Sequence, residues 1–282
     1  MVTAAVAVGI AVVAAWSAVV GLLWWQQDRM IFPGWGFRTV EASGVERPDE
    51  RLVLVTPDET QLVGALHRTK SISRGLILVF GGNAEDADWR LRDFRGWLDD
   101  VDIATFFYRG YGPSGGVPSE AALVADAVLI HDRLVDQLRP TRVVAAGFSL
   151  GSGVAAQLAR QRRLAGLILV TAFDSIEAMA AARYPFAPVS RLLRHPFRSD
   201  VALAGLDLPV AVIAAEHDHV VPPRHTRRLV DELEQPVQVT WIKDADHVSI
   251  YDHVEYRVAF AAALDRVLAA TPSDTAPAPS GL

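Results

Sequence analysis

The sequence predicts an α/β fold: a mostly parallel, eight-stranded sheet with helices on both faces, preceded by one N-terminal transmembrane helix. Two observations predict it. Short apolar segments rich in β-branched residues alternate with helical patterns from residue 75 to residue 270, and this order builds parallel sheets. The first 25 residues contain no charged side chain. A chain of 282 residues is long enough for one large domain beyond that segment.

The first element is the apolar segment 2–25, which we expect to be a transmembrane helix. At about 1.5 Å per residue it can cross a hydrocarbon core of about 30 Å. Trp24 and Trp25 suit the aromatic belt at a membrane interface. The alternatives are a cleaved signal peptide, although no Lys or Arg precedes the apolar run, and a buried helix. The flanking charges leave open which side of the membrane holds the rest of the chain.

A Gly/Pro-bearing stretch, 26–49, is expected to be a juxtamembrane linker, and the globular domain is expected to cover 50–270. The turn cluster 57–60 lies between two apolar runs and predicts an antiparallel hairpin. The segments after it predict a mostly parallel sheet. The expected strands are 52–55, 62–67, 75–80, 101–108, 142–147, 167–171, 210–215 and 237–242, and the expected helices are 88–98, 120–138, 149–162, 224–233 and 251–270.

Two stretches depart from this alternation. Residues 173–207 contain short helical patterns interrupted by prolines, which suits a cap-like insertion that shapes a pocket. An ordinary long connection is the alternative interpretation. Residues 271–282 are rich in Pro and Ser and have almost no bulky apolar residue, so they predict a disordered tail.

The catalytic prediction starts from the stretch 147–151, which reads Gly-Phe-Ser-Leu-Gly and matches G-x-S-x-G. It lies between an expected strand and an Ala-rich expected helix, which is the context of a nucleophile elbow. Glycines on both sides of Ser149 avoid collisions in a sharp turn. The helix N-terminus that follows favours negative charge at the serine.

A serine at its ordinary pKa is a poor nucleophile and needs an oriented base. Asp218 follows the strand 210–215, and His247 follows the strand 237–242. The residues therefore arrive in the order Ser, Asp, His, each at the carboxyl end of a parallel strand and so at one edge of the sheet. We predict that Ser149 is the nucleophile, His247 the base, and Asp218 the group that orients the base.

Other titratable residues offer alternatives. Glu216 lies nearer the strand end than Asp218, and His253 is a second candidate base, although it falls inside an expected helix. His217, His219 and His225 lie among acidic residues, but the intervening turn offers no clear set of converging metal ligands. We therefore expect no metal and no cofactor.

Acyl transfer chemistry also needs an oxyanion hole made of two backbone N–H groups. Leu150, the residue after the serine, should supply one. The loop after the strand 75–80 should supply the other, and we assign it to Asn83, with Gly82 and Ala84 as neighbouring candidates. A Gly-rich loop can instead cradle phosphate, but this loop has neither the Lys-Ser/Thr of a P-loop nor a full G-x-G-x-x-G.

Composition excludes several other classes. The chain has no cysteine, which excludes disulfides, thiolate metal sites and a Cys nucleophile. The formal net charge is −6, and basic residues are scattered, which argues against nucleic acid as a partner.

Taken in order, these motifs resemble the α/β-hydrolases, and more narrowly the membrane-anchored Bem46-like branch with its serine aminopeptidase S33-type hydrolase domain. The resemblance covers roughly residues 25–268. It implies the Ser149–Asp218–His247 triad and backbone oxyanion donors at Asn83 and Leu150. One departure is Gly81–Gly82, where many relatives carry His-Gly. The segments that carry the resemblance are 27–33, 81–84, 108–112, 114–115, 118–120, 147–151, 218–222 and 246–247.

We therefore expect a membrane-anchored serine hydrolase that cleaves carboxylic esters or thioesters through an acyl-enzyme on Ser149. The tether and the apolar residues of the cap-like insertion favour small-molecule or lipid-like acyl substrates. An acyltransferase that uses the same triad is one alternative, and a non-catalytic membrane-bound interaction protein with a hydrolase fold is another. The natural substrate, the membrane orientation and the oligomeric state stay open.

Overall fold

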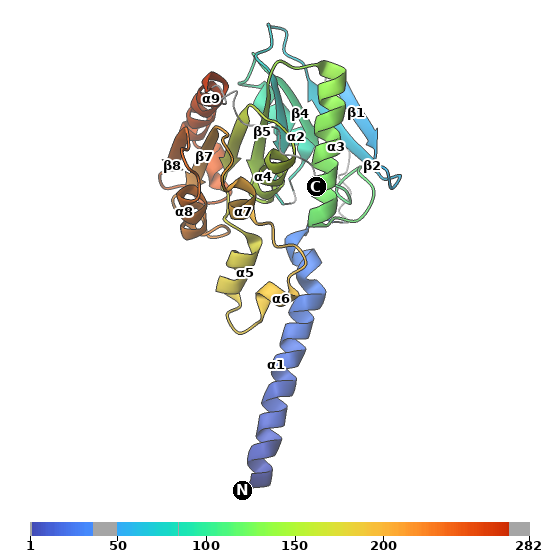
Figure 1. The fold of residues 1–282 in the computed structure, drawn as a ribbon, viewed down its shortest axis with the longest axis vertical. Helices are drawn as coiled ribbons and strands as arrows, with labels where there is room; N and C mark the ends of the chain where they lie inside the picture. Colours follow the sequence, from blue (N-terminus) through green and yellow to red (C-terminus); the bar gives the residue numbers. More distant parts are fainter. Residues whose placement is uncertain (1, 36–49, 84, 271–282) are drawn as a thin grey trace.

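The computed structural model describes residues 2–35, 50–83 and 85–270. One eight-stranded sheet forms its centre, in the order β1-β2-β4-β3-β5-β6-β7-β8 (Figure 1). The first two strands form the expected antiparallel hairpin, β2 pairs antiparallel with β4, and every later pairing is parallel. The predicted fold class is therefore confirmed. The strands are β1 Glu50–Val55, β2 Gln61–His67, β3 Leu76–Phe80, β4 Asp102–Phe106, β5 Val143–Phe148, β6 Gly166–Val170, β7 Val210–Ala215 and β8 Gln238–Ile242.

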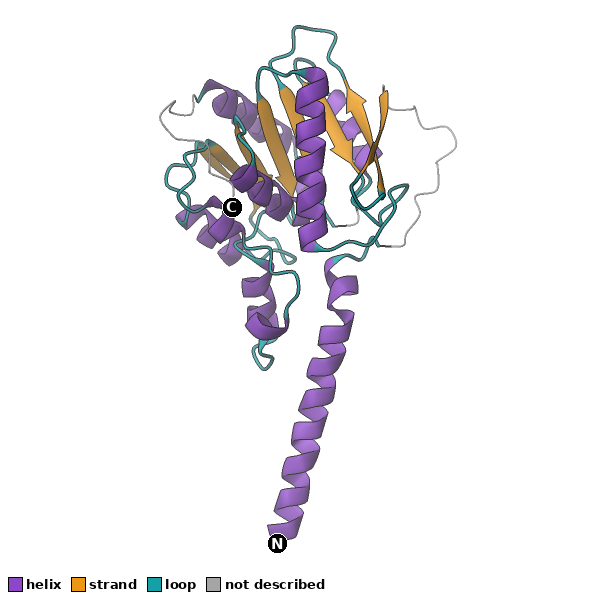
Figure 2. Ribbon diagram, turned by 45° about the vertical axis from the view of Figure 1, so that its right-hand side comes forward, coloured by secondary structure: helices purple, strands orange, loops and turns teal. Residues whose placement is uncertain are grey.

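Helices cover the sheet on both faces (Figure 2). Strands β3, β5, β6 and β7 are buried at every position, as expected of strands covered on both sides. One apolar core lies under α3, α4 and α8, and a second lies under α2 and α9. The helices of these layers are α2 Ala87–Arg95, α3 Glu120–Leu138, α4 Leu150–Gln161, α8 Pro223–Asp231 and α9 Val254–Ala269.

The N-terminal helix, α1 Val2–Ile31, is longer than the sequence predicted. Residues 26–31 continue the helix and are not linker, so that boundary was wrong. Gln, Arg and Met support a helix, and the helix ends just before Phe32, whose successor Pro33 disfavours helical backbone. Among the described residues, α1 is the helix long and apolar enough to cross a membrane, and only 6% of its most apolar window is buried.

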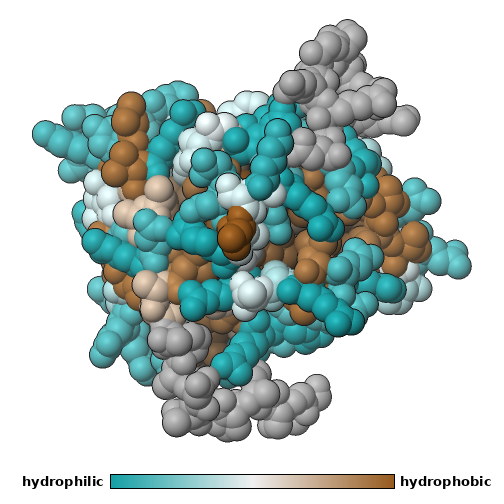
Figure 3. Space-filling model, turned by 90° about the horizontal axis from the view of Figure 1, so that it is seen from above, coloured by the Kyte–Doolittle hydropathy of each residue, from teal (hydrophilic) through white to brown (hydrophobic). Residues whose placement is uncertain are grey.

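Residues 173–207 form short helices, as the prolines indicated: α5 Ile176–Arg183, α6 Val189–Leu192 and α7 Ser199–Leu203. We call the segment 173–207 the cap. Part of the cap lies beside α1, at the pole of the molecule from which α1 leaves (Figure 1). The opposite pole is largely hydrophilic (Figure 3). The predicted disordered tail, 271–282, and residues 36–49 of the predicted linker lie outside the described residues.

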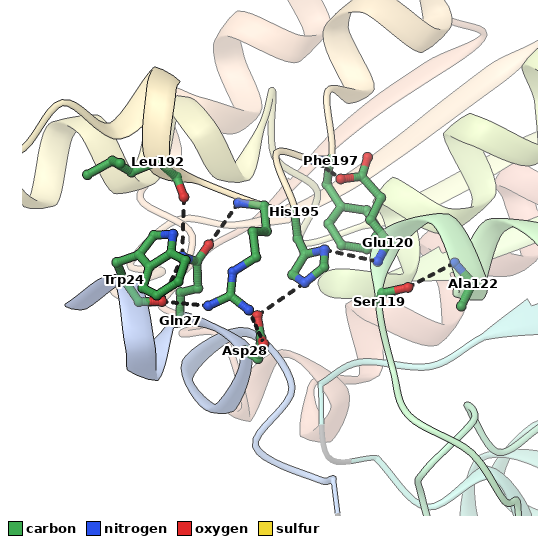
Figure 4. Close-up of polar contacts among 10 residues, drawn as sticks. Trp24, Gln27, Asp28, Ser119, Glu120, Ala122, Leu192, His195 and Phe197 are labelled. Atoms are coloured by element: carbon green, nitrogen blue, oxygen red, sulfur yellow. Dashed lines mark hydrogen bonds and ion pairs between the residues drawn. The ribbon is translucent and has the colours of Figure 1, made fainter. Parts of the chain in front are cut away.

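Polar side chains at the end of α1 fasten it to the cap (Figure 4). The Gln27 side chain donates to the Leu192 carbonyl at 3.2 Å and accepts from the Arg194 N–H at 2.8 Å. The Arg194 guanidinium pairs with the Asp28 carboxylate at 2.6 Å. These contacts explain why the helix continues past the apolar segment: its polar last turns are paired with cap groups more than 160 residues away in the chain.

His195 extends this contact from α1 to α3. Its Nε2 lies 3.2 Å from an Asp28 oxygen, and its Nδ1 accepts the Glu120 backbone N–H at 3.2 Å. Burial lowers the pKa of His195 below its usual value, the nearby Asp28 carboxylate raises it, and Arg194 lowers it further. The neutral ring fits the geometry, because a proton on Nδ1 would face the N–H of Glu120.

Candidate active site

Ser149 lies in a strained turn between β5 and α4. Its φ of 48° and ψ of −115° are unfavourable for a residue with a side chain. Its N–H donates to the Val170 carbonyl at 2.9 Å, which anchors the turn to the neighbouring strand. A Cβ on Gly147 would lie 2.4 Å from the Gly151 carbonyl oxygen, and one on Gly151 would lie 2.0 Å from that of Phe80. Both glycines are therefore required by close backbone approach.

The three predicted catalytic side chains meet at the carboxyl edge of the sheet. His247 Nε2 lies 3.0 Å from Ser149 Oγ, and His247 Nδ1 lies 2.7 Å from Asp218 Oδ2. An ionised carboxylate can only accept, so Nδ1 carries the proton and Nε2 is left as the acceptor that faces the serine hydroxyl. This is the tautomer that a general base needs.

Burial and backbone contacts hold this arrangement. Asp218 is 4% exposed and Ser149 is 9% exposed. The second Asp218 oxygen, Oδ1, accepts the N–H groups of Val220 and Val221 at 2.9 and 2.7 Å. Both carboxylate oxygens are therefore occupied, which fixes the plane of the group that orients His247.

The alternative acid and base lie elsewhere. Glu216 is exposed, and its carboxylate accepts the Asp244 N–H at 3.4 Å. His253 is the N-cap of α9, and its Nδ1 lies 4.0 Å from a Glu255 oxygen. The expectation that His253 lies inside a helix was wrong, because the 3₁₀ turn Ser249–Asp252 precedes it and α9 begins at Val254.

The histidines after β7 do not converge on one point. His225 is fully buried, and its Nδ1 lies 2.8 Å from Asp174. The described residues that come close enough to share a cation are Glu216, His217 and Asp244, all exposed, and this group includes neither His219 nor His225. The three histidines 217, 219 and 225 therefore do not form the cluster that their sequence spacing allowed.

The loop after β3 presents the candidate oxyanion donors. The Gly82 N–H donates to Glu85 Oε2 at 2.7 Å, so this N–H group already has an acceptor and is not available to an oxyanion. Tyr108 donates to the Gly81 carbonyl at 2.8 Å, and Tyr111 reaches the Asn83 side-chain oxygen at 3.5 Å. Ala84 lies outside the described residues. Leu150 opens α4, where the first N–H groups have no partner within the helix.

A buried ion pair beneath this loop was not predicted. Arg90 is 1% exposed and its Nε pairs with Glu85, the residue that holds Gly82. The guanidinium also lies 4.2 Å from the Phe148 ring centroid and 4.5 Å from that of Tyr251. Burial lowers the pKa of Arg90, but Glu85, Tyr256 and Tyr251 together outweigh it, and the pKa lies above its usual range. An arginine in an amphipathic helix pattern carries no local sign of such a role.

Comparison with known proteins places this geometry in a family. The family model for an alpha/beta hydrolase domain matches residues 118–262, a range that contains Ser149, Asp218 and His247. The chain belongs to the α/β-hydrolase family. Protein bem46 of Schizosaccharomyces pombe is 30% identical over 76% of this chain and 77% of its own length, so the predicted resemblance to the Bem46-like branch is confirmed.

Two further comparisons give the family context of this α/β-hydrolase. The lysophosphatidylserine lipase ABHD12 of Danio rerio is 32% identical over 58% of this chain and 48% of its own length. The Pyrococcus furiosus esterase Pf2001 superposes with a TM-score of 0.65 at 16% identity, over 82% of this chain and all of that one. That superposition shows the shared fold.

Proposed function

We propose that this α/β-hydrolase is a membrane-anchored serine hydrolase that cleaves carboxylic esters or thioesters through an acyl-enzyme on Ser149. The observation that carries the proposal is the hydrogen-bonded line from Asp218 through His247 to Ser149, with distances of 2.7 and 3.0 Å. A nucleophile on a strained turn, a base in the correct tautomer and a buried carboxylate that orients the base are the parts that acyl transfer requires.

In the proposed reaction, His247 Nε2 accepts the proton of Ser149 as Oγ attacks the acyl carbonyl. The negative charge that develops on the carbonyl oxygen is stabilised by the N–H groups of Leu150 and Asn83. His247 then gives its proton to the leaving alcohol or thiol, and the acyl-enzyme forms. Water attacks that ester with His247 again as base, which releases the acid and restores Ser149.

The membrane part of the proposal is supported by α1, whose apolar surface is almost entirely exposed in the described structure. An exposed apolar helix of this length is stable in a bilayer and unfavourable in water. Lipid-like acyl esters are the substrate class that such a tether brings closest. The name of the zebrafish relative, a lysophosphatidylserine lipase, is consistent with that class.

Labelling with a fluorophosphonate probe tests the proposal on the full chain in detergent. We expect labelling of the wild-type protein at Ser149 and none of Ser149→Ala. A panel of p-nitrophenyl esters and acyl thioesters of increasing chain length should then be hydrolysed by the wild type only. Folded wild-type protein that neither reacts with the probe nor hydrolyses any ester would refute the enzymatic assignment.

A further inference from the structure

An apolar groove lies between α1 and the cap. It encloses a cavity of about 110 Å³ and is lined by side chains from α1, α5, α6 and the residues that join the two cap helices. Val20 and Leu23 line it from α1, and Ile176, Ala180 and Leu192 line it from the cap. The groove is separate from the Ser149 side chain, and the reaction described above does not use it.

The tip of the cap reaches far along the apolar part of α1. The Trp16 indole N–H donates to the Phe186 carbonyl at 3.0 Å, and the Phe186 side chain is half exposed. Trp16 lies nine residues before Trp25, which is about 14 Å along a helix. A monolayer of hydrocarbon is about 15 Å thick. With Trp25 at the interface, the cap tip therefore lies at the depth of lipid acyl chains, as does the part of the groove lined by Val20 and Leu23. The part lined by Met30 and Ile31 lies beyond the interface, toward the globular domain.

At the end of the groove that lies toward the globular domain, polar groups lie beside the apolar side chains of Met30 and Ile31. Gln27 lines the groove and bonds to the cap, and the Arg194 guanidinium lies 4.8 Å from the Trp24 ring centroid. This end lies where a bilayer places its headgroups and their phosphates. The groove is thus apolar at acyl-chain depth, and at headgroup depth Gln27 lines it beside the apolar Met30 and Ile31.

A short stretch of the cap connects the groove to the helix that begins at the nucleophile elbow. Ile176, which lines the groove, follows Phe173 by three residues. A Cβ on Gly153, one helical turn after Ser149, would lie 3.1 Å from the Phe173 ring and 2.9 Å from the Phe197 ring. The cap residues that continue from the groove therefore pack directly on the helix that begins at the elbow.

We propose that this groove binds one acyl chain of a membrane lipid, so that α1 forms half of a lipid-binding site in addition to its role as an anchor. The proposal rests on the proposed function in one respect: the bound chain belongs to a substrate ester whose carbonyl is presented to Ser149. The lipid enters from the bilayer along α1, with its headgroup held beside Gln27 and Arg194.

A binding test that needs no catalysis uses the Ser149→Ala chain reconstituted in vesicles of phosphatidylcholine that carries a diazirine on one acyl chain. After photolysis, we expect the label on groove-lining residues of α5 and α6. Ala180→Trp fills the groove and should remove that label, whereas Ala182→Trp, exposed on the same helix and outside the groove, should keep it. Equal labelling of the two variants would overturn the proposal.

A kinetic test uses the ratio of turnover with a long-chain lipid ester in vesicles to turnover with a soluble acetyl ester. Ala180→Trp should lower this ratio about tenfold or more, because a misfit of even one methylene in an apolar pocket changes turnover by about 10- to 200-fold. Ala182→Trp should not change the ratio. A second pair of variants makes the same comparison from the α1 side of the groove. Val20→Phe should lower the ratio and Val19→Phe should not, since Val20 is buried in the groove and Val19 is 47% exposed.

The two proposals fail in different ways. A wild-type chain that hydrolyses neither ester contradicts the serine hydrolase but leaves the photolabelling test of the groove intact. A chain that hydrolyses both esters, with the same ratio in all four variants and the wild type, contradicts the groove but not the hydrolase.

Discussion

The ion pair between Glu85 and Arg90 offers a sharp test of how the loop after β3, the proposed source of an oxyanion donor, is positioned. The Glu85 carboxylate accepts two donors, the Gly82 N–H at 2.7 Å and Arg90 Nε. Glu85→Gln keeps the shape of the side chain but leaves only one acceptor oxygen for the two donors. Either Arg90 loses its partner inside the protein, or the loop loses the contact that holds Gly82.

The structure sets the size of the effect. Breaking a buried ion pair by removing one partner costs about 3 to 5 kcal/mol. We expect a cost at the lower end of this range, because Arg90 keeps its contacts with the Phe148 and Tyr251 rings and has an Asp93 oxygen at 3.9 Å. About 3 kcal/mol corresponds to a fall in melting temperature of about 6 to 12 °C for a domain of this size. We expect kcat to fall about tenfold to a hundredfold, less than the loss of an oxyanion donor outright.

Two double variants separate positioning from stability. In Glu85→Gln with Arg90→Met, the amide oxygen has only Gly82 to accept, so both melting temperature and kcat should recover. In Glu85→Leu with Arg90→Met, the apolar pair restores stability, but the Gly82 N–H has no acceptor and kcat should stay low. The assay is thermal melting in detergent together with turnover of a short p-nitrophenyl ester. Wild-type kcat in the Leu–Met variant would refute the positioning role of Glu85.

Three further outcomes are expected. Asp218→Asn should lower kcat about 10⁴-fold with an unchanged melting temperature, because an amide no longer fixes the His247 tautomer, and a small effect on ester turnover would contradict this role. Gly151→Ala should abolish folding, since its Cβ would lie 2.0 Å from the Phe80 carbonyl oxygen, and wild-type melting would contradict the elbow packing. For His195, burial lowers the folded pKa below 6.5, so its contribution to stability is present above about pH 6.5 and is lost as the pH falls through the folded pKa. Melting temperatures relative to His195→Gln should therefore fall between pH 7 and pH 5, and a constant difference would contradict the buried contact.

The sheet and the three site residues could be predicted because their signals are local. A strand buried on both faces reads as a continuous apolar run, as Leu76–Phe80 does. Parallel strands end at one edge, so residues that follow β5, β7 and β8 come together without any knowledge of side-chain packing. Ser149, Asp218 and His247 are such residues, and their distances agree with the prediction.

The features that escaped prediction depend on partners remote in the chain. Whether residues 26–31 are helix or linker is decided by cap groups, since Gln27 bonds to Arg194 across 167 positions. The role of Arg90 depends on Glu85 and on rings from two other elements, and nothing in its sequence neighbourhood distinguishes it from a solvated helix arginine. The start of the last helix also differs from the prediction, because a 3₁₀ turn precedes His253 in place of the first turn of the expected helix.

These contacts also make α1 inseparable from the domain that carries the site. Phe32, just after the helix, is fully buried and belongs to the same apolar core as Leu150 and Tyr111. Asp28 pairs with His195, which in turn accepts the first N–H of α3. A chain that lacks residues 1–25 would keep Asp28 and Phe32 but lose most of the helix that orders them. It would also lose the α1 side of the groove and expose the cap side. Activity measured on such a fragment would report on Ser149 and its partners, whereas selectivity for acyl chain length has to be measured on the full chain in a bilayer.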